Sequence, residues 1–277
     1  MKPFLFVTDL HGHPGKYERA LTLAKETGAG LVVNGGDIGP PARRHEAQER
    51  FYREFLRPHL ACYQAEGIRY LTLTGNDDLG GLDELLDAVC AEFPMASHIS
   101  QRIATVDGFA FVGMNRVTDF PFRLKDRARR DTERFVFGHQ LGPAVLSTRD
   151  GFLEIRDWPA HAETLPTIAE ELDSLPLPPD PARAVYVLHG PPAGLGLDVV
   201  RGGAAVGSPA TSAFLSRVQP LLSLHGHIHE SPEESGVWRA NIGRTVCIQP
   251  GQSAAGLTVV VGSLETMSFE RKIVPVA

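Results

Sequence analysis

The stretch FLFVTDLH, residues 4–11, joins a short apolar run to two polar side chains at its end. Continuous apolar runs of this length are typical of strands that are buried on both faces of a sheet. The run therefore predicts a strand, and Asp9 and His11 follow directly after it. Four later segments have the same form: LVVNGGD (31–37), YLTLTGNDD (70–78), VYVLHG (185–190) and LLSLHGHIH (221–229).

Predicted helices separate the first three of these strands. Residues 14–27 begin with proline and stop before glycine, and both are boundary signals of a helix. Residues 43–66 carry an apolar stripe with a kink expected at Pro58, and residues 81–93 carry a similar stripe. Strands that alternate with helices at this spacing predict βαβ units. Ligands of such sheets bind beyond the carboxyl ends of the strands, where all five polar clusters lie.

The second half of the chain is less uniform. Residues 103–112 predict a hairpin with a two-residue turn, and residues 245–248, 257–261 and 268–273 predict further strands. Residues 116–182 are the least regular part of the sequence and are expected to form an irregular insertion or lid. We expect one domain over residues 1–277 that carries this insertion.

Composition excludes several classes of protein. The chain has 277 residues, of which 43% are hydrophobic and 22% charged, as in an average globular protein. Its apolar runs are far shorter than the roughly 18 residues of a membrane span, and the first ten residues lack a signal-peptide layout. A net charge of −6 disfavours a general nucleic-acid surface. Three cysteines without a CxxC pair fit a reducing compartment, so we expect a cytoplasmic protein without membrane contact; its oligomeric state is not predicted.

The five clusters together offer two aspartates, one asparagine and four histidines. Oxygen and nitrogen donors in this mixture suit Mn, Fe, Zn or Ni better than Mg or Ca. Each cluster alone is weak evidence, because a histidine after a strand is commonly an ordinary buried polar residue. Their order along the chain, each after a predicted strand, indicates a shared metal site. Its candidate ligands are Asp9, His11, Asp37, Asn76, His189, His227 and His229.

With these residues in place, the sequence resembles the calcineurin-like metallophosphoesterase family, whose ordered pattern is D-x-H, G-D, G-N-H/D/C, an isolated His and G-H-x-H. The resemblance runs from Asp9 to about residue 251. It implies a four-layer α/β/β/α sandwich of two mixed sheets flanked by helices. It also implies two divalent metal ions per chain. Carried over by motif, the first ion takes Asp9, His11, Asp37 and His229, and the second takes Asp37, Asn76, His189 and His227, with Asp37 bridging.

Two cations roughly 3.5–4 Å apart share a bridging water and lower its pKa towards neutrality. The resulting hydroxide attacks phosphorus in line, which predicts hydrolysis of a small phosphodiester or phosphomonoester substrate. The diester is slightly favoured, and manganese is the first metal to test. The alternative is a catalytically weak or inactive scaffold that keeps the phosphoesterase fold.

One position departs from the commonest family pattern. Many members carry histidine after the motif-three asparagine, where it assists the leaving group, whereas this chain has Asp77. An unperturbed aspartate is ionised at neutral pH and donates a proton poorly. Asp77 and Asp78 are therefore tentative catalytic residues, and Asp78 is also a candidate for supporting another residue of the site.

The remaining candidates have weaker signals. His13 and His225 lie beside predicted ligands and are expected to support them, whereas Arg43 and His139 are candidates for substrate contact. Residues 123–134, with six basic and three acidic side chains, are more compatible with a solvated helix face than with a lid that delivers arginine to phosphate. Residues 249–253, QPGQS, predict a tight turn that connects two strands.

Overall fold

Two six-stranded sheets face each other in the computed structural model, which describes residues 2–41 and 45–276. The first sheet has the order β16-β15-β1-β2-β3-β4 and the second β13-β14-β12-β11-β6-β5. The first is built from β1 (Phe4–Val7), β2 (Leu31–Asn34), β3 (Arg69–Thr72), β4 (Ala96–His98), β15 (Leu257–Ser263) and β16 (Ser268–Val274). The second is built from β5 (Ile103–Val106), β6 (Phe109–Met114), β11 (Ala184–Leu188), β12 (Leu222–Leu224), β13 (Arg239–Ile242) and β14 (Thr245–Ile248).

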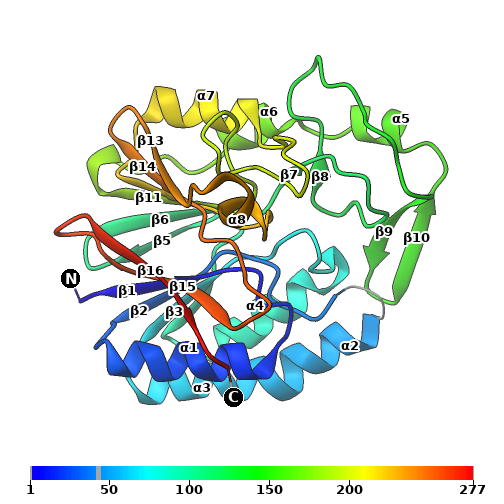
Figure 1. Cartoon of the computed structure of the whole chain (residues 1–277). Coiled ribbons are helices and arrows are strands. Elements are labelled where there is room, and N and C mark those ends of the chain that lie inside the picture. Colours follow the sequence, from blue (N-terminus) through cyan, green and yellow to red (C-terminus); the bar gives the residue numbers. More distant parts are fainter. Residues whose placement is uncertain (1, 42–44, 277) are drawn as a thin grey trace.

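Both sheets are mixed. In the first, β1, β2, β3 and β4 run parallel while β15 pairs antiparallel with β1 and β16. In the second, β6, β11, β12 and β14 run parallel while β5 and β13 pair antiparallel at the edges. The βαβ units predicted for the first three strands and the 103–112 hairpin are thus confirmed, and the carboxyl ends of the parallel strands lie at one side of the molecule (Figure 1).

Helices cover the outer faces of the two sheets, which gives the four layers that the resemblance implied (Figure 1). Below the first sheet lie α1 (Pro14–Glu26), α2 (His45–Arg50), the π-helix η1 (Phe51–Leu56), α3 (Arg57–Ala65), η2 (Gly80–Leu82) and α4 (Asp83–Ala91). The second sheet is covered by α6 (Ile168–Asp173) and α7 (Pro209–Val218), whose buried residues pack with Tyr186 and Leu188 of β11. The short helix α8 (Ser231–Ser235) follows the last histidine cluster.

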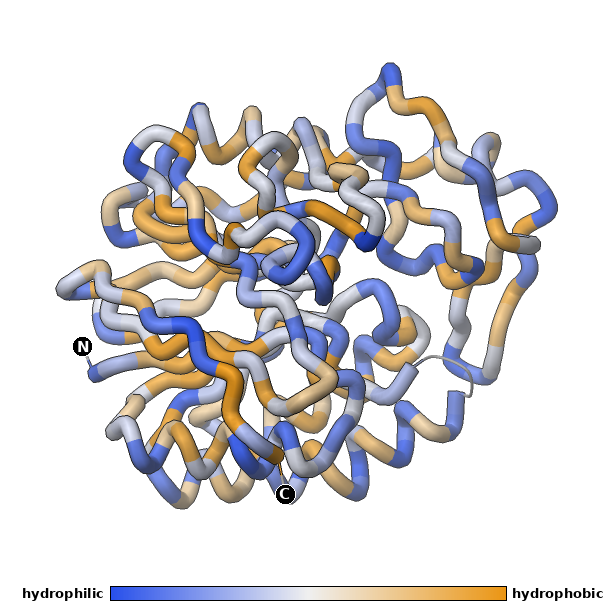
Figure 2. Tube along the Cα trace, viewed as in Figure 1, coloured by the Kyte–Doolittle hydropathy of each residue, from blue (hydrophilic) through white to orange (hydrophobic). Residues whose placement is uncertain are grey.

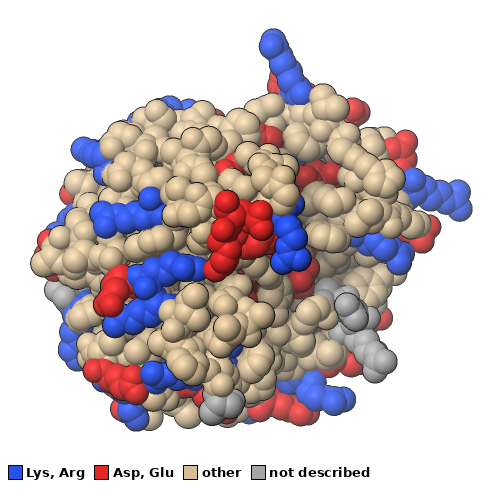
Figure 3. All heavy atoms as spheres, viewed as in Figure 1, with Lys and Arg blue, Asp and Glu red and all other residues tan. Residues whose placement is uncertain are grey.

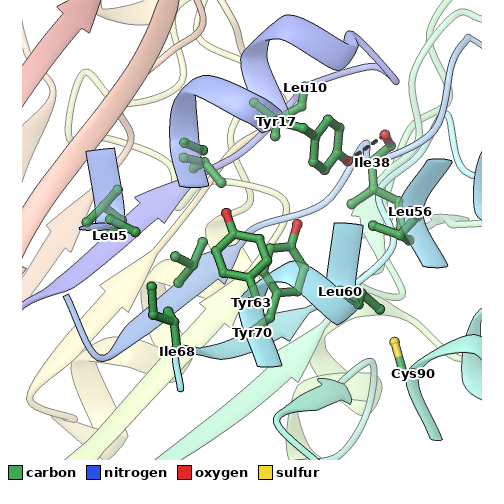
Figure 4. Packing of buried hydrophobic residues seen from close by; sticks show 14 of the residues in the cluster. Leu5, Leu10, Tyr17, Ile38, Leu56, Leu60, Tyr63, Ile68, Tyr70 and Cys90 are labelled. Atoms are coloured by element: carbon green, nitrogen blue, oxygen red, sulfur yellow. Dashed lines mark hydrogen bonds between the residues drawn. The ribbon is translucent and has the colours of Figure 1, made fainter. Parts of the chain in front are cut away.

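Successive side chains along a strand point to opposite faces of the sheet, so the hydrophobic core has one part on each side of the first sheet. Leu5 and Val7 of β1 point to the helices, whereas Phe4 and Phe6 point to the second sheet. Figure 2 shows the resulting concentration of hydrophobic residues along the strands. On the helix side, Tyr17 lies fully buried and donates a hydrogen bond from its hydroxyl to the carbonyl of Ile38 at 2.7 Å (Figure 4). This bond ties α1 to the loop that carries Asp37.

The helix predicted over residues 43–66 differs from expectation. Residues 43 and 44 lie outside the described residues, and the rest of the predicted helix is divided into α2, η1 and α3. A π-helical segment, Phe51–Leu56, precedes Pro58, which lies in the first turn of α3. Because proline has no N–H to donate, a wider turn ahead of it accommodates the missing hydrogen bond without a break.

The region predicted as irregular, residues 116–182, contains short elements of its own. These are β7 (Val117–Thr118), β8 (Ala128–Arg129), β9 (Ala144–Thr148), β10 (Gly151–Ile155), α5 (Trp158–Glu163), α6 and η3 (Pro181–Arg183). Most of it projects beside the carboxyl ends of the strands (Figure 1). None of the helices that the structure describes is both long and apolar enough to cross a membrane.

Residues 123–134 do not form the expected solvated helix face. The segment is irregular apart from β8, and three of its cationic side chains are buried and paired within the protein. Lys125 contacts Asp119, Arg127 pairs with Asp83, and Arg129 pairs with Glu171. A charge run in sequence gives no information on such partners, because each acid comes from a different part of the chain.

Candidate metal centre

The polar clusters meet at the carboxyl ends of β1, β2, β3, β11 and β12. Asp9 and His11 follow β1, Asp37 follows β2, and Asn76 follows β3 of the first sheet. His189 follows β11, and His227 and His229 follow β12 of the second sheet. Parallel strands in both sheets therefore deliver all seven predicted ligands to the same side of the molecule.

Four of these residues form a compact group. One ligand atom from each of Asp9, His11, Asp37 and His229 lies within 4.8 Å of all the others. The Nε2 atoms of His11 and His229 are 3.0 Å apart, and His229 Nε2 lies 3.4 Å from Asp9 Oδ1. Asp9 and Asp37 are buried, whereas both histidines are partly exposed. The group thus has two carboxylates at its base and two imidazoles towards the surface.

A second group gathers around the side-chain oxygen of Asn76. This Oδ1 atom lies 3.1 Å from His189 Nε2 and 2.5 Å from His227 Nδ1. His189 Nε2 is also 3.6 Å from Asp37 Oδ2, and the same Oδ2 lies 3.8 Å from His11 Nε2. Asp37 therefore stands between the two groups, with histidines from both within 4 Å.

The backbone at these positions is strained. Among the described residues, eight non-glycine residues have positive φ, and four of them are Asp9 (55°), His11 (45°), Asp37 (50°) and His227 (71°). Left-handed backbone costs about 1 kcal/mol or more per L-residue, so the surrounding fold must enforce it. Strain gathered in this way is typical of functional sites.

Two glycines allow the clusters to approach one another. A Cβ atom on Gly75 would lie 2.1 Å from Asp37 Oδ1 and 2.6 Å from His189 Nε2. A Cβ atom on Gly226 would lie 2.1 Å from Thr8 Oγ1 and 2.6 Å from Asp9 Oδ2. No larger residue fits at either position, so the glycines of the G-N-D and G-H-x-H motifs are steric requirements of the site.

Aspartate and histidine charges stabilise one another in the cluster. Burial opposes the charged form of Asp37, but His189 outweighs it and holds the pKa of Asp37 well below its usual range. Burial likewise opposes the charged form of His189, yet Asp37 raises the pKa of His189 to about 9. The Asp9–His229 pair behaves similarly, with the pKa of His229 raised to about 9 despite burial.

The pKa values of His227 and Asp77 shift in the opposite direction to those of the paired histidines and aspartates. Burial, followed by the charge of His189, lowers the pKa of His227 to about 4, which leaves its imidazole neutral and able to act as a ligand. Burial and the nearby charge of Asp37 raise the pKa of Asp77 to about 6. The backbone N–H of Asp77 donates to Asp37 Oδ1 at 2.8 Å, which fixes the bridging candidate.

The cluster fits divalent metal ions on its own geometry. Asp9 Oδ2 and His11 Nδ1 are buried and have no hydrogen-bond partner, a costly arrangement for atoms of this polarity. Carboxylate oxygens and imidazole nitrogens within 4.8 Å of one another supply the lone pairs that coordinate a transition-metal ion. These unpartnered atoms are suited to bind a divalent cation.

The side chain of Asp78 is buried behind the candidate ligands. It is fully buried and accepts backbone hydrogen bonds from Gly75 (2.7 Å), Ile38 (3.0 Å) and Gly39 (2.8 Å). Burial and the charge of Asp37 raise the pKa of Asp78 to about 6. The side chain joins the loop that carries Asp37 to the loop that carries Asn76, so it positions ligands, and a catalytic role does not fit this location.

Two buried glutamines that the sequence analysis did not identify as site residues act in the same way. Gln48 donates to the carbonyls of Pro40 (2.8 Å) and Asp77 (2.6 Å) and accepts from the N–H of Leu79 (2.9 Å). Gln249 donates to the carbonyls of Gly226 and Ile228 and so holds the loop that carries His227. The 249–253 turn therefore does more than connect two strands.

The remaining predicted site residues lie outside the cluster. His225 is fully buried and contacts Ser223 Oγ and the carbonyls of Leu188 and Gly190, which fixes the backbone beside His189. His13 is exposed at the start of α1, and His139 is exposed in the insertion; neither lines the cleft at the cluster. Arg43 lies outside the described residues.

The cluster opens into a cleft of about 580 Å³ that is lined by His11, Asp37, Asn76, His227 and His229 together with residues of the insertion. A hollow of about 700 Å³ elsewhere, between η2 and the β9–β10 turn, contains none of the seven predicted ligands. The candidate metal site therefore lies in the smaller of the two clefts.

Comparisons with known proteins agree with this geometry. The family model for calcineurin-like phosphoesterases matches residues 2–231. One solved crystal structure has a TM-score of 0.62 at 15% identity over 98% of each chain, and TT1561 of Thermus thermophilus has 0.58 at 16% identity over 98% of each. A dimetal phosphatase from Danio rerio, LOC 393393, has 0.51 at 13% identity over 94% of this chain and 92% of that one. No curated protein matches the sequence. At these identities the structural likeness shows the fold alone.

Proposed function

The chain belongs to the calcineurin-like phosphoesterase family, and from this premise we propose that it is a dinuclear, metal-dependent phosphoesterase. The observation that carries the proposal is the convergence of Asp9, His11, Asp37 and His229, with ligand atoms mutually within 4.8 Å, at the base of an open cleft. The substrate is a small phosphodiester or phosphomonoester, and the diester is slightly favoured.

Two divalent ions are assigned to the two groups of donors. Asp9, His11, Asp37 and His229 would hold the first, and Asp37, Asn76, His189 and His227 would hold the second. When bound, such ions supply Lewis acidity that activates water and offsets charge on the phosphoryl oxygens. Mn, Fe, Zn and Ni all suit this donor set.

The protein's own residues fix the geometry of the reaction. Asp37 is positioned as the shared ligand, because its Oδ1 accepts the N–H of Asp77 while its Oδ2 faces His11 and His189. The Nδ1 atom of His189 lies 2.8 Å from the carbonyl of Gly35, and this contact orients Nε2 towards Asn76 and Asp37. Neutral Asn76 limits the negative charge of the second group and keeps the ions strongly Lewis-acidic.

The charge of the cleft supports a diester. Four acidic residues line it, and no lysine or arginine does so within residues 2–41 and 45–276. Of the four, Asp37 is a candidate metal ligand and Asp119 is paired with Lys125, which leaves the carboxylates of Asp77 and Glu230. A phosphomonoester carries close to two negative charges at neutral pH, whereas a diester carries one. The single charge suffers less repulsion from the two carboxylates.

The test compares hydrolysis of bis-p-nitrophenyl phosphate and p-nitrophenyl phosphate with Mn²⁺, Zn²⁺, Ni²⁺ or Fe²⁺, and measures bound metal per chain. We expect metal-dependent turnover, two ions per chain, and loss of both turnover and one ion in His189→Ala. His161→Ala, on α5 outside the cleft, is the matched control and should retain both properties.

A catalytically inactive scaffold is the second candidate, and Asp77 in place of the usual histidine is the observation that favours it. Absence of turnover with either ester in all four metals would support the scaffold. A content of one ion per chain would instead indicate a mononuclear site. Active protein whose unfolding temperature is unchanged by metal removal would exclude a purely structural role for the ions.

A further inference from the structure

The cleft beside the metal ligands has an apolar side. Six of its lining residues are apolar, and together they are called the apolar wall here: Phe120, Pro121, Phe122, Val200, Val206 and Ile228. Phe122 is 61% exposed and Val206 45% exposed, although both are large hydrophobic side chains. Exposed apolar surface of this kind, next to polar groups that converge on one point, is typical of a ligand site.

The apolar wall adjoins the metal ligands directly. The ring of Phe120 packs edge-on against the imidazole of His227, with centroids 5.9 Å apart, and Phe122 lies 6.1 Å beyond it. Ile228 stands between His227 and His229 in sequence. A phosphate group held at the metal centre would therefore place its nearest ester substituent against Phe120, Phe122 and their neighbours.

A buried ionic network holds this wall in place. Asp119 accepts hydrogen bonds from Lys125 Nζ (2.8 Å), Trp158 Nε1 (2.9 Å) and Gln140 Nε2 (2.9 Å). Lys125 is fully buried, donates also to the carbonyl of Phe120, and lies 4.8 Å from the centroid of the Phe120 ring. Residues 119 and 120 are thus anchored from within the insertion, and the site is preorganised before a ligand arrives.

The second segment of the wall is also tied to the site. The N–H of Val199 donates to Ser231 Oγ at 3.1 Å, and the N–H of Arg201 donates to Glu230 Oε1 at 3.1 Å. These bonds attach the 199–206 loop to α8, where Figure 3 shows acidic side chains gathered in the middle of the drawn face. The rim of the cleft on this side therefore carries the carboxylate of Glu230, with the charge of Arg201 near it.

We propose that the apolar wall recognises an uncharged aromatic substituent of the phosphoester, so that the substrate class is a phosphodiester with at least one aromatic group near the phosphorus. The inference rests on the proposed function of the metal centre. Phe120 and Phe122 supply ring faces and edges, the valines and Ile228 supply aliphatic contact, and Asp77 and Glu230 disfavour a second anionic group.

The test uses two phosphonates that differ in the substituent on phosphorus, at a pH above the second pKa of both acids, where they carry the same charge. Binding of phenylphosphonate and methylphosphonate to the Mn²⁺-loaded protein is measured by calorimetry, which does not depend on turnover. We expect phenylphosphonate to bind about tenfold more tightly, the gain from burying part of one ring. In Phe122→Ala the ratio of the two Kd values should fall to about twofold.

Phe152→Ala provides the matched control, because Phe152 is 44% exposed in the same insertion but does not line the cleft. This variant should keep the tenfold ratio. Equal Kd values in the unmodified protein, or an unchanged ratio in Phe122→Ala, would overturn the inference. Absence of p-nitrophenyl ester hydrolysis while phenylphosphonate still binds preferentially would contradict the phosphoesterase proposal and leave the aromatic recognition standing.

Discussion

The Oδ2 atom of Asp77 lies 3.6 Å from Nδ1 of His11, at the point where the metal ligands open into the cleft. The Asp77 side chain is 38% exposed, so an incoming phosphate group meets its carboxylate. Histidine at this position would assist the leaving group, whereas a carboxylate repels an anion. We therefore expect this departure from the family pattern to act on the charge of the substrate.

We expect Asp77→Asn to improve the use of a phosphomonoester more than that of a diester. The amide keeps the size of the side chain and the backbone N–H that binds Asp37, but it removes one negative charge. Repulsion of about 0.5 kcal/mol per substrate charge amounts to about 1 kcal/mol for the dianion and predicts a KM for p-nitrophenyl phosphate lowered roughly fivefold. The KM for bis-p-nitrophenyl phosphate should fall by about half that factor or less.

Steady-state kinetics with both esters check this, and Asp107→Asn, in the exposed β5–β6 turn, is the control for removal of a charge elsewhere. Equal changes in the two KM values would contradict the charge argument. Loss of bound metal from Asp77→Asn would place Asp77 among the ligands instead.

Gln249→Ala should weaken both the fold and the metal site. The side chain is fully buried and bonds to the backbone of Gly226, Ile228 and Gly251, so its truncation leaves these groups unpaired. We expect the free energy of unfolding to fall by about 2 kcal/mol and metal affinity to decrease, because the loop that carries His227 loses its support. Urea unfolding and metal titration measure the two effects.

Gln64→Ala is the matched control, since Gln64 is exposed on α3. A Gln249→Ala protein with stability within about 0.5 kcal/mol of the unmodified chain and unchanged metal affinity would show that the turn is only a connection.

The contrast between Asp37 and Gln249 shows what the sequence could and could not predict. Asp37 follows an apolar run, and parallel strands carry such residues to a common edge, so local pattern and sheet topology suffice to place it. The role of Gln249 depends on carbonyls that lie far along the chain, at Gly226 and Ile228, and no periodicity encodes these partners.

Partners that are distant in sequence also explain why the sequence predicts a solvated helix face for residues 123–134. Buried Arg127 pairs with the partly exposed Asp83 across 44 residues, and the sequence shows only a run of charges. Periodicity predicts which face of a strand is buried, but pairing of buried charges is decided by tertiary structure.

His59 should make stability depend on pH between about 6.5 and 4. It lies between the aromatic rings of Tyr17, Phe55 and Tyr63, with 7% of its surface exposed, and burial lowers the pKa of His59 to about 4. The unfolded chain takes up this proton near pH 6.5, whereas the folded chain does so only near pH 4. Protonation thus favours the unfolded state, and stability falls as the pH decreases through this window.

His59→Phe removes the proton uptake. We expect the free energy of unfolding of the unmodified chain, relative to His59→Phe, to decrease by about 3 kcal/mol from pH 7 to pH 4. Urea unfolding at several pH values measures the difference, and metal-free protein is used so that ligand protonation is common to both chains. His139→Phe, at an exposed position, is the control for the same replacement elsewhere in the chain; a flat difference for His59→Phe would contradict the prediction.

Lys125→Met should destabilise the protein far more than the loss of an exposed lysine. Lys125 is fully buried with Asp119, so its replacement leaves a buried carboxylate whose charge is balanced only by hydrogen bonds from Trp158 and Gln140. Removal of one partner of a buried pair costs about 3 to 5 kcal/mol. Lys25→Met, which breaks an exposed pair with Glu66, should cost less than about 1 kcal/mol.

The double variant Lys125→Met with Asp119→Asn distinguishes an uncompensated charge from a loss of packing. If the unpaired carboxylate of Asp119 causes the destabilisation of Lys125→Met, then Asp119→Asn should restore at least half of the lost free energy of unfolding. If the double variant is no more stable than Lys125→Met, the contacts of the lysine stem with Phe120 and Trp158 carry the effect. In the first case the wall beside the metal centre is held by charge, and its stability should respond to substitutions that change charge around Asp119.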